Sequence, residues 1–476
     1  MSKLCDPFLR VVSLHAQEMR VKRLLLRYYP PGLIVEYQHK AGEVGMKTVD
    51  LFDLTVDVDV EALASEIVAS QSPLLSDRQK PVVMKLILRL IEKVRPIVAE
   101  SRFELAQVHH THILPMTNCC WTKDGSRFAT ASYDRSCVLF SSRGGDPAIP
   151  LHGGHSNVVY AVAFNVPYSD RVITGSFDKT AVIWDAHSGQ PLHALEGHSG
   201  EIVCVTFSAD GKTCATGSMD GTARIWSVSS GDLLHELQGH SGEVISVSFS
   251  TDSTRLLTAS FDTTARVWDA VTGQCTAVLA GHKGEISTSV FSFGCDLCAT
   301  ASIDGTARLW NASTGDCLDT LTGHADEVLD VAFNLVGSRV ATASSDGTAR
   351  VYNARTGACV AILNGHSGEL SRVHFSPNGS FLLTASADRT CRIWSASSGE
   401  CLQILDGHAE EVFACGFNYE ADMVFTASKD NTVRVYQARA SSVKGRPRLL
   451  SSLDSLGTAS GLEDAAYRLR NSEDFS

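Results

Sequence analysis

Short runs of apolar and β-branched residues, bounded by Gly, Asp and Asn, fill the chain between residues 102 and 437. One stretch shows the pattern clearly. Its four runs are Ile202–Phe207, Thr213–Ser218, Thr222–Trp226 and Leu233–Leu237. Asp210-Gly211 and Asp220-Gly221 separate the first three runs. Runs of this kind with Asp-Gly between them predict a unit of four short β-strands.

Residues 20–98 follow a different pattern, which predicts a small separate α/β domain. Leu33–Tyr37 and Met46–Phe52 resemble the two strands of a hairpin. Two later stretches place apolar residues at helical spacing, namely Val60, Leu63, Ala64, Ile67 and Val68 in one, and Val83, Leu86, Ile87, Leu90, Ile91 and Val94 in the other. We expect these helices to pack on each other and on the hairpin. The alternative is that part of one helical face docks on the rest of the protein or on a partner.

The strand pattern recurs with a fixed period. A Gly-His dipeptide occurs seven times, with one His-to-His step of 43 residues and five of 42, at Gly154-His155, Gly197-His198, Gly239-His240, Gly281-His282, Gly323-His324, Gly365-His366 and Gly407-His408. Each His is followed by a Ser-x-Asp triplet and then by an aromatic residue. One period upstream, His112, Ser132, Asp134 and Phe140 form a degenerate first repeat. This pattern resembles the WD40 family and implies an all-β, eight-bladed WD40 β-propeller over residues 102–437.

The two ends of the repeat region are expected to join. The last repeat ends near Tyr436 after only three strands, while Phe103–Val108 supplies an unpaired strand before His112. Pairing them would close the ring and remove an exposed sheet edge.

Each repeat contains His, Ser, Asp and Trp in an order that suggests catalysis. The clearest sets are His198, Ser218, Asp220 and Trp226; His240, Ser260, Asp262 and Trp268; and His282, Ser302, Asp304 and Trp310. A catalytic site is normally built once, so a set copied in successive repeats indicates a structural hydrogen-bond tetrad. We expect Asp to accept from the imidazole, the imidazole to bond to Ser, and Ser to accept from the indole N–H.

Two further residue positions form rings on the propeller. The position three after the repeated His is Glu201, Glu243, Glu285, Glu327, Glu369 and Glu411 in six successive repeats. The middle residue of Ser-x-Asp is apolar in the first five repeats, as Tyr133, Phe177, Met219, Phe261 and Ile303. One interpretation is that the Glu residues are repeated, solvent-exposed side chains without a binding role, and that the apolar residues cover the tight turn. The other is a binding face for a protein segment that carries basic and hydrophobic residues.

Composition, charge and the lack of certain motifs argue against several classes of function. Of 476 residues, 44% are hydrophobic and 20% charged, and the net charge of −12 argues against a nucleic-acid partner. We find no apolar run of about 20 residues and no signal-peptide layout, so we expect no membrane insertion and a cytoplasmic protein. The sequence has no P-loop, dinucleotide fingerprint, HExxH or nucleophile elbow, which argues against an enzyme.

The cysteines and the two ends of the chain are the remaining features that the sequence lets us interpret. The 14 cysteines should be reduced in the cytosol. Cys275, Cys317, Cys359 and Cys401 recur at steps of 42 and are interpreted as packing residues. The single Cys295-x-x-Cys298 has no second pair, so neither a metal nor another cofactor is expected. Residues 1–19 are expected to be a flexible extension and residues 438–476 a disordered tail.

A narrower resemblance rests on four segments, residues 24–32 (LLLRYYPPG), 112–118 (HILPMTN), 157–165 (NVVYAVAFN) and 175–180 (GSFDKT). They are similar to the family of dynein assembly factors with WD repeats. The resemblance implies a non-enzymatic, monomeric cargo adaptor that links outer dynein arms to the intraflagellar transport B complex. It also implies a location in the cytoplasm and in the cilium or flagellum, including basal body and axoneme. One partner site would be shaped by the N-terminal domain, anchored by Tyr28, Tyr29 and the apolar stripe from Val83 to Val94. The alternative is a substrate receptor of a ubiquitin ligase or a general signalling scaffold.

Overall fold

The chain divides into two compact units in a computed structural model. The structure describes residues 19–27, 32–39, 44–51, 58–72, 74–94, 101–110, 112–122, 125–142, 144, 146–165, 168–440 and 467–468. One unit comprises Met1–Pro96 with Ser441–Ser476, and the other comprises Ile97–Ala440. The predicted extension lies outside the described residues except for Met19, and so does most of the predicted tail.

The smaller unit is a sheet with two helices. Its strands are β1 (Met19–Arg27), β2 (Gly32–His39), β3 (Val44–Asp50) and β36 (Tyr467–Arg468), in the order β3-β2-β1-β36. Its helices are α2 (Val60–Ser70) and α3 (Lys80–Val94), and a 3₁₀ turn at Asp77–Gln79 directly precedes α3. The predicted hairpin and both helices are confirmed. The sequence interpretation missed β1, and it was wrong to assign all of residues 438–476 to a disordered tail, because Tyr467 pairs with Leu24.

The two helices pack on each other and on the hairpin through their apolar stripes, as predicted. Ile67 of α2 and Ile87 of α3 are buried in one cluster with Leu33 and Val35 of β2. The side chain of Asp59 caps α2 by accepting from the backbone N–H of Glu61 at 3.0 Å. The small unit therefore has a hydrophobic core of its own.

The larger unit is an eight-bladed propeller, and each blade is a four-stranded antiparallel sheet. Blade 1 is formed by β5 (Met116–Trp121), β6 (Arg127–Ser132), β7 (Cys137–Ser141) and β8 (Ile149–Leu151); blade 2 by β9 (Val159–Phe164), β10 (Arg171–Ser176), β11 (Ala181–Asp185) and β12 (Pro191–Leu195); blade 3 by β13 (Ile202–Phe207), β14 (Thr213–Ser218), β15 (Ala223–Ser227) and β16 (Leu233–Leu237); blade 4 by β17 (Val244–Phe249), β18 (Arg255–Ser260), β19 (Thr264–Asp269) and β20 (Cys275–Ala280).

The second half repeats the same order. Blade 5 is formed by β21 (Ile286–Phe291), β22 (Leu297–Ser302), β23 (Ala307–Asn311) and β24 (Cys317–Leu321); blade 6 by β25 (Val328–Phe333), β26 (Arg339–Ser344), β27 (Thr348–Asn353) and β28 (Cys359–Asn364); blade 7 by β29 (Leu370–Phe375), β30 (Phe381–Ser386), β31 (Cys391–Ser395) and β32 (Cys401–Leu405); blade 8 by β33 (Val412–Phe417), β34 (Met423–Ser428), β35 (Thr432–Ala440) and β4 (Ser101–His110).

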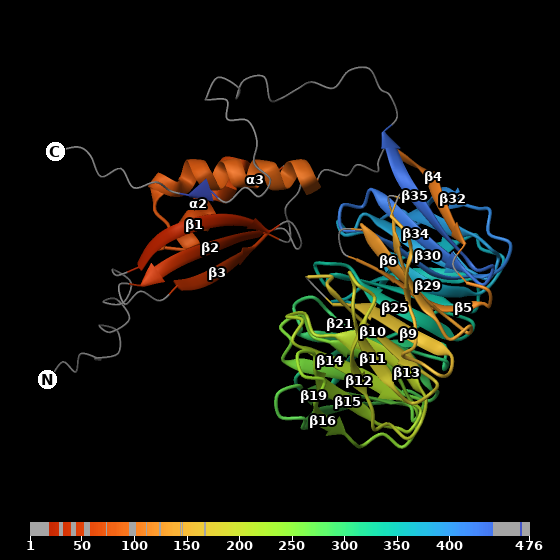
Figure 1. Cartoon of the computed structure of the whole chain (residues 1–476). Helices are drawn as coiled ribbons and strands as arrows, with labels where there is room; N and C mark the ends of the chain where they lie inside the picture. Colours follow the sequence, from red (N-terminus) through yellow and green to blue (C-terminus); the bar gives the residue numbers. More distant parts are fainter. Residues whose placement is uncertain are drawn as a thin grey trace, which may run out of the picture. The chain divides into compact units, whose positions relative to one another are not determined.

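Blade 8 closes the ring with a strand from the start of the unit. β4 pairs antiparallel with β35 from Ser101↔Ala440 to His110↔Thr432, which confirms the predicted closure. Figure 1 shows the orange strand β4 lying beside the blue strand β35. The innermost strands also contact each other around the circle, from β5 through β33 and back to β5. With β4 in place, blade 8 has four strands like the other seven blades.

The core of the propeller consists of layers between neighbouring blades. One such layer joins Ile173 and Leu195 of blade 2 to Ile202 and Trp226 of blade 3. The packing role expected for Cys275, Cys317, Cys359 and Cys401 is wrong, because these thiols lie exposed on outermost strands, where one face of the strand meets solvent. No helix in the described parts of the chain is long and apolar enough to cross a bilayer.

Candidate protein-interaction face

The repeated polar residues do meet in each blade, with one correction. In blade 3, Nδ1 of His198 lies 2.9 Å from Oδ2 of Asp220, as expected. Its Nε2 lies 2.8 Å from Oγ1 of Thr216, and the indole N–H of Trp226 donates to the same oxygen at 3.0 Å. The fourth member is therefore Thr216 and not Ser218. The same holds for Thr258 in blade 4 and Thr300 in blade 5, in place of Ser260 and Ser302.

Strand register explains the correction. Thr216 pairs with Arg224, so it lies diagonally beside Trp226 on one face of the sheet. Ser218 lies beyond the last residue pair of these strands, at the turn, and its Oγ accepts the backbone N–H of Asp220 at 3.1 Å. Ser302 likewise donates to the carbonyl of Glu285 at 2.8 Å. These serines fix the turn rather than bond to the histidine.

Electrostatics favour a neutral histidine beside an ionised aspartate. Burial alone would raise the pKa of Asp304, but hydrogen bonds from Thr306, Lys283 and His282 lower it to about 2. Burial lowers the pKa of His282, and the neighbouring Asp304 opposes this effect only in part. In blades 2 to 5 and in blade 7, every member of the tetrad has a hydrogen-bond partner within the set, so each of these sets is a structural clamp within its blade.

The two predicted rings lie next to each other on one face of the propeller. In blade 4 the backbone N–H of Phe261 donates to the carbonyl of Glu243 at 3.0 Å. The equivalent bond links Met219 to Glu201 at 2.9 Å, and the remaining blades repeat it. Each apolar ring residue is therefore bonded through its backbone to the residue at the Glu position. We call this surface the acidic–apolar face; it comprises the six Glu residues and the five apolar residues predicted above.

Exposure of the side chains differs along the apolar ring. Tyr133, Met219, Phe261 and Ile303 are 45%, 42%, 38% and 37% exposed. Phe177 is less exposed because it stacks on Tyr160 with ring centroids 5.2 Å apart. Apolar side chains exposed at equivalent positions of several blades favour a recognition surface over simple turn cover.

Sequence reasoning missed two residues of this face. Ile113 is 90% exposed and Leu114 is 46% exposed. They follow His112 directly, where other repeats carry Ser-Gly or similar residues. That local departure from the repeat was the signal that could have identified them. They add to the apolar surface of Tyr133 in blade 1, and we include them in the acidic–apolar face.

The acidic half of the face is solvated to different degrees. Glu285, Glu327 and Glu369 are exposed, whereas Glu201, Glu243 and Glu411 are partly buried. Lys429 forms an ion pair with Glu411 in blade 8. Tyr28 and Tyr29, which were predicted to shape a partner site, lie outside the described residues.

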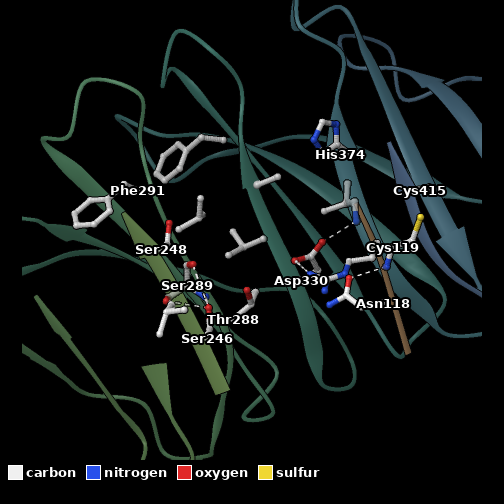
Figure 2. Close-up of a pocket in the computed structure, with 18 of the residues that line it drawn as sticks. Asn118, Cys119, Ser246, Ser248, Thr288, Ser289, Phe291, Asp330, His374 and Cys415 are labelled. Carbon is white, nitrogen blue, oxygen red and sulfur yellow. Dashed lines mark hydrogen bonds and ion pairs between the residues drawn. The ribbon is translucent and has the colours of Figure 1, made fainter. Parts of the chain in front are cut away.

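A second feature is the central channel, which holds a cavity of about 610 Å³. Figure 2 shows Ser246, Ser248, Thr288 and Ser289 on one side of it. Asp330, which is 6% exposed, also lines the cavity, and one of its oxygens accepts the N–H of Val373 at 3.0 Å. Its other oxygen lies 3.4 Å from Nη1 of Arg372.

This charged pair is not repeated in the other blades, and sequence reasoning missed it. The third residue of the innermost strand is Asp330 in blade 6 and Arg372 in blade 7, but uncharged in the remaining six blades. Burial raises the pKa of Asp330, while Arg372 and the N–H of Val373 lower it. Both carboxylate oxygens already have partners, so the pair binds blade 6 to blade 7. Within the described ranges, no group of three or more His, Cys, Asp and Glu side chains could hold a metal ion.

Comparison with known proteins identifies the repeats. Eight segments match the family described as "WD domain, G-beta repeat", at residues 103–141, 149–185, 189–227, 231–269, 273–311, 315–353, 357–395 and 399–437. The first segment runs from the closing strand to the end of β7, in agreement with eight blades. Together the segments cover more than half of the chain.

Several curated relatives match about two fifths of the chain. The chain is 53% identical over 190 residues to the Homo sapiens protein "Dynein assembly factor with WD repeat domains 1". The proteins of that name from Mus musculus and Xenopus laevis are 51% identical over 190 residues and 52% identical over 191 residues. Each alignment covers 40% of this chain and 45% of the relative, so the match spans less than half the length of either protein. The repeats and the relatives point to a non-catalytic scaffold.

A solved structure supports the fold. The crystal structure of the computationally designed Ika8 protein superposes on 70% of this chain and 98% of its own, with a TM-score of 0.62 and 28% sequence identity.

Proposed function

Because the chain belongs to the WD40-repeat family, we propose that it is a protein-binding adaptor in the assembly of axonemal dynein. The names of the relatives support the dynein role. In the finer form of the proposal, the adaptor links outer dynein arm components to a subunit of the intraflagellar transport B complex. It works as a monomer in the cytoplasm and in the cilium or flagellum, including basal body and axoneme.

The acidic–apolar face is the observation that carries this proposal. In blade 5, Ile303 offers exposed apolar area, and Glu285, whose carbonyl accepts the backbone N–H of Ile303, offers exposed negative charge beside it. Burying apolar side chains supplies most of the affinity in a protein interface, whereas complementary charge guides the approach and the orientation of the partner. A partner segment with hydrophobic and basic residues fits this combination.

The rest of the propeller supports the face as a rigid platform. The turns that present it are held by tetrads such as His240, Thr258, Asp262 and Trp268. A surface that is already ordered loses little conformational entropy on binding, so a modest patch binds more tightly than it would on a mobile loop.

Affinity capture from ciliated cells tests the proposal. The full chain should retain dynein heavy chains and transport B subunits, identified by mass spectrometry. The triple variant Glu243→Lys, Glu285→Lys and Glu327→Lys should lose at least one of these two groups. A matched control reverses three exposed acids in the loops between third and fourth strands, Asp232→Lys, Asp316→Lys and Glu400→Lys. Recovery of cullin-ring components in place of dynein would favour a ubiquitin-ligase receptor instead.

A further inference from the structure

Blades 1 and 2 depart from the other blades at two positions of the face that carries the Glu residues. The position that is Glu in blades 3 to 8 is Pro115 in blade 1 and Val158 in blade 2. The residue after the aspartate of Ser-x-Asp is basic in both blades, as Arg135 and Lys179, whereas it is Gly in blades 3, 5 and 6. Blades 1 and 2 therefore lack the inner acid and add a cation at the turn.

Both cations are accessible to a ligand. Arg135 and Lys179 are exposed, and within the described ranges neither side chain has a hydrogen bond or an ion pair. The neighbouring carboxylates of Asp134 and Asp178 are only 16% and 8% exposed, because they bond to the histidines of their own blades. A ligand that approaches these two turns therefore meets the cations and not the acids beside them.

Three aromatic side chains belong to the same surface. Tyr133, which is 45% exposed, and Phe177 each precede the basic residue of their turn by two positions. Phe177 stacks on Tyr160, with ring centroids 5.2 Å apart. Burial raises the pKa of the Tyr160 hydroxyl, and the nearby Tyr133 raises it further. The aromatic rings thus connect the two blades. We call this surface the aromatic–basic sector; it comprises Tyr133, Arg135, Tyr160, Phe177 and Lys179.

Blades 1 and 2 hold the sector in one arrangement. Thr117 of β5 donates to the carbonyl of Val159 of β9 at 2.6 Å, and these two innermost strands contact each other. Arg127 of blade 1 donates to the carbonyls of Ser169 and Ala186 of blade 2 at 2.7 and 2.9 Å. Because the two blades are bonded at several points, the sector loses little conformational entropy when a ligand binds.

From these observations we propose that the aromatic–basic sector binds a segment of a partner protein in which acidic residues flank large apolar side chains. The carboxylates bind Arg135 and Lys179 through charge-assisted hydrogen bonds, and the apolar side chains pack on the exposed ring of Tyr133. The Glu residues of blades 3 to 8 repel such a segment, which confines it to blades 1 and 2. The same face then holds segments of opposite charge on different blades. The proposal rests on the role of the chain as a protein-binding adaptor and not on dynein as its cargo.

A fluorescence anisotropy titration of the full chain tests the sector. The acidic probe is fluorescein-Glu-Glu-Phe-Leu-Glu-Glu-amide, and the basic probe has Lys in place of each Glu. The double variant Arg135→Gln and Lys179→Gln should weaken the acidic probe at least about tenfold and change the basic probe less than about twofold. The triple variant Glu243→Lys, Glu285→Lys and Glu327→Lys should weaken only the basic probe. The acidic probe therefore decides the sector and the basic probe decides the Glu residues, so the two failures are distinguishable.

A matched control locates the binding. Lys283→Gln with Arg389→Gln removes one Lys and one Arg from exposed positions of blades that keep their Glu, and Arg389 has the same φ of 72° as Lys179. This control should change the affinity for the acidic probe less than about twofold. An acidic probe with Ser in place of Phe and Leu should bind at least about threefold more weakly. The four substituted side chains are exposed, so the variants keep the packing of the blades.

Four results would each overturn the proposal. The acidic probe does not bind below about 1 mM, or the Arg135 and Lys179 double variant binds it unchanged. The control double variant weakens it as much as the sector variant does, or the Ser probe binds as tightly as the probe with Phe and Leu.

Discussion

The side-chain amide of Gln403 makes two hydrogen bonds with the backbone of Phe103. The N–H of Phe103 donates to Oε1 at 2.9 Å, and Nε2 of Gln403 donates to the carbonyl of Phe103 at 2.6 Å. The two residues are 300 positions apart, one in blade 7 and the other in the closing strand. The amide thus imitates the pairing of a neighbouring strand and ties the closure of blade 8 to blade 7.

This relationship predicts the effect of Gln403→Leu. The variant keeps the size of the side chain but leaves an N–H and a carbonyl of Phe103 without these partners. Stability should fall by about 1–3 kcal/mol, measured by denaturant unfolding. Gln238→Ala, which removes an exposed amide bonded only to Glu236, should change stability by less than about 0.5 kcal/mol. Equal effects of the two variants would mean that the amide does not hold the closure.

The corrected tetrad predicts a contrast between two hydroxyls in blade 3. Thr216→Val removes the oxygen shared by His198 and Trp226 and leaves two buried donors or acceptors unsatisfied. We expect a loss of about 2–4 kcal/mol for this variant. Ser218→Ala should cost clearly less, because the Ser218 hydroxyl serves the N–H of Asp220 at the turn. The opposite ranking in unfolding experiments would restore serine as the tetrad member.

A turn residue offers a route to higher stability. Thr263 follows the tetrad aspartate of blade 4 and has a φ of 68°, a conformation that β-branched residues rarely adopt. The equivalent residue in blade 5 is Gly305, with a φ of 78°. Thr263→Gly should therefore stabilise the protein by about 1 kcal/mol, and Gly305→Thr should destabilise it by a similar amount. Melting temperatures that move in the reverse directions would show that the turn is not strained.

Stability should depend on pH in two stages. Burial lowers the pKa of six repeat histidines below the usual 6.5, at His198, His240, His282, His324, His366 and His408. Below pH 6.5 the unfolded chain therefore binds more protons than the folded one, so stability decreases as the pH falls through 6.5. A second decrease should occur between about pH 4 and pH 2, because hydrogen bonds hold the pKa of Asp262 and Asp304 at about 2.

Calorimetry between pH 4.5 and pH 8 measures the first stage. The melting temperature should be lower at pH 5.5 than at pH 7.5. His282→Gln and Asp304→Asn in combination remove one titrating pair and should make the decrease smaller. A melting temperature that is constant or higher at pH 5.5 would contradict the pKa directions.

The blade architecture was predictable because its signals are local and repeated. Gly-His, Ser-x-Asp and the aromatic residue recur within each repeat, and they fix both the number of blades and the need for a closing strand. The tetrad serine was wrong because spacing along the chain does not reveal which hydroxyl the strand register places beside Trp226. Strand β1 was missed because its run of Arg, Lys and Leu does not alternate strictly.

The candidate sites depended on contacts that no local pattern encodes. Asp330 and Arg372 become neighbours only when blades 6 and 7 pack in the channel. Gln403 and Phe103 become partners only because ring closure brings together residues 300 positions apart. The acidic–apolar face was predictable because each of its residues recurs at one place in the repeat, whereas Ile113 occurs once and was overlooked.

The most direct test of the account is the affinity of the full chain for purified outer dynein arms, measured by biolayer interferometry. The variant Ile113→Ser, Phe261→Ser and Glu285→Lys combines three changes on the acidic–apolar face. It should raise Kd at least about tenfold while leaving the unfolding midpoint nearly unchanged, since all three side chains are exposed. The control Asp232→Lys, Asp316→Lys and Glu400→Lys should bind as the wild type does. An unchanged Kd in the face variant, or an equal loss in the control, would contradict the claim that this face recognises the dynein partner.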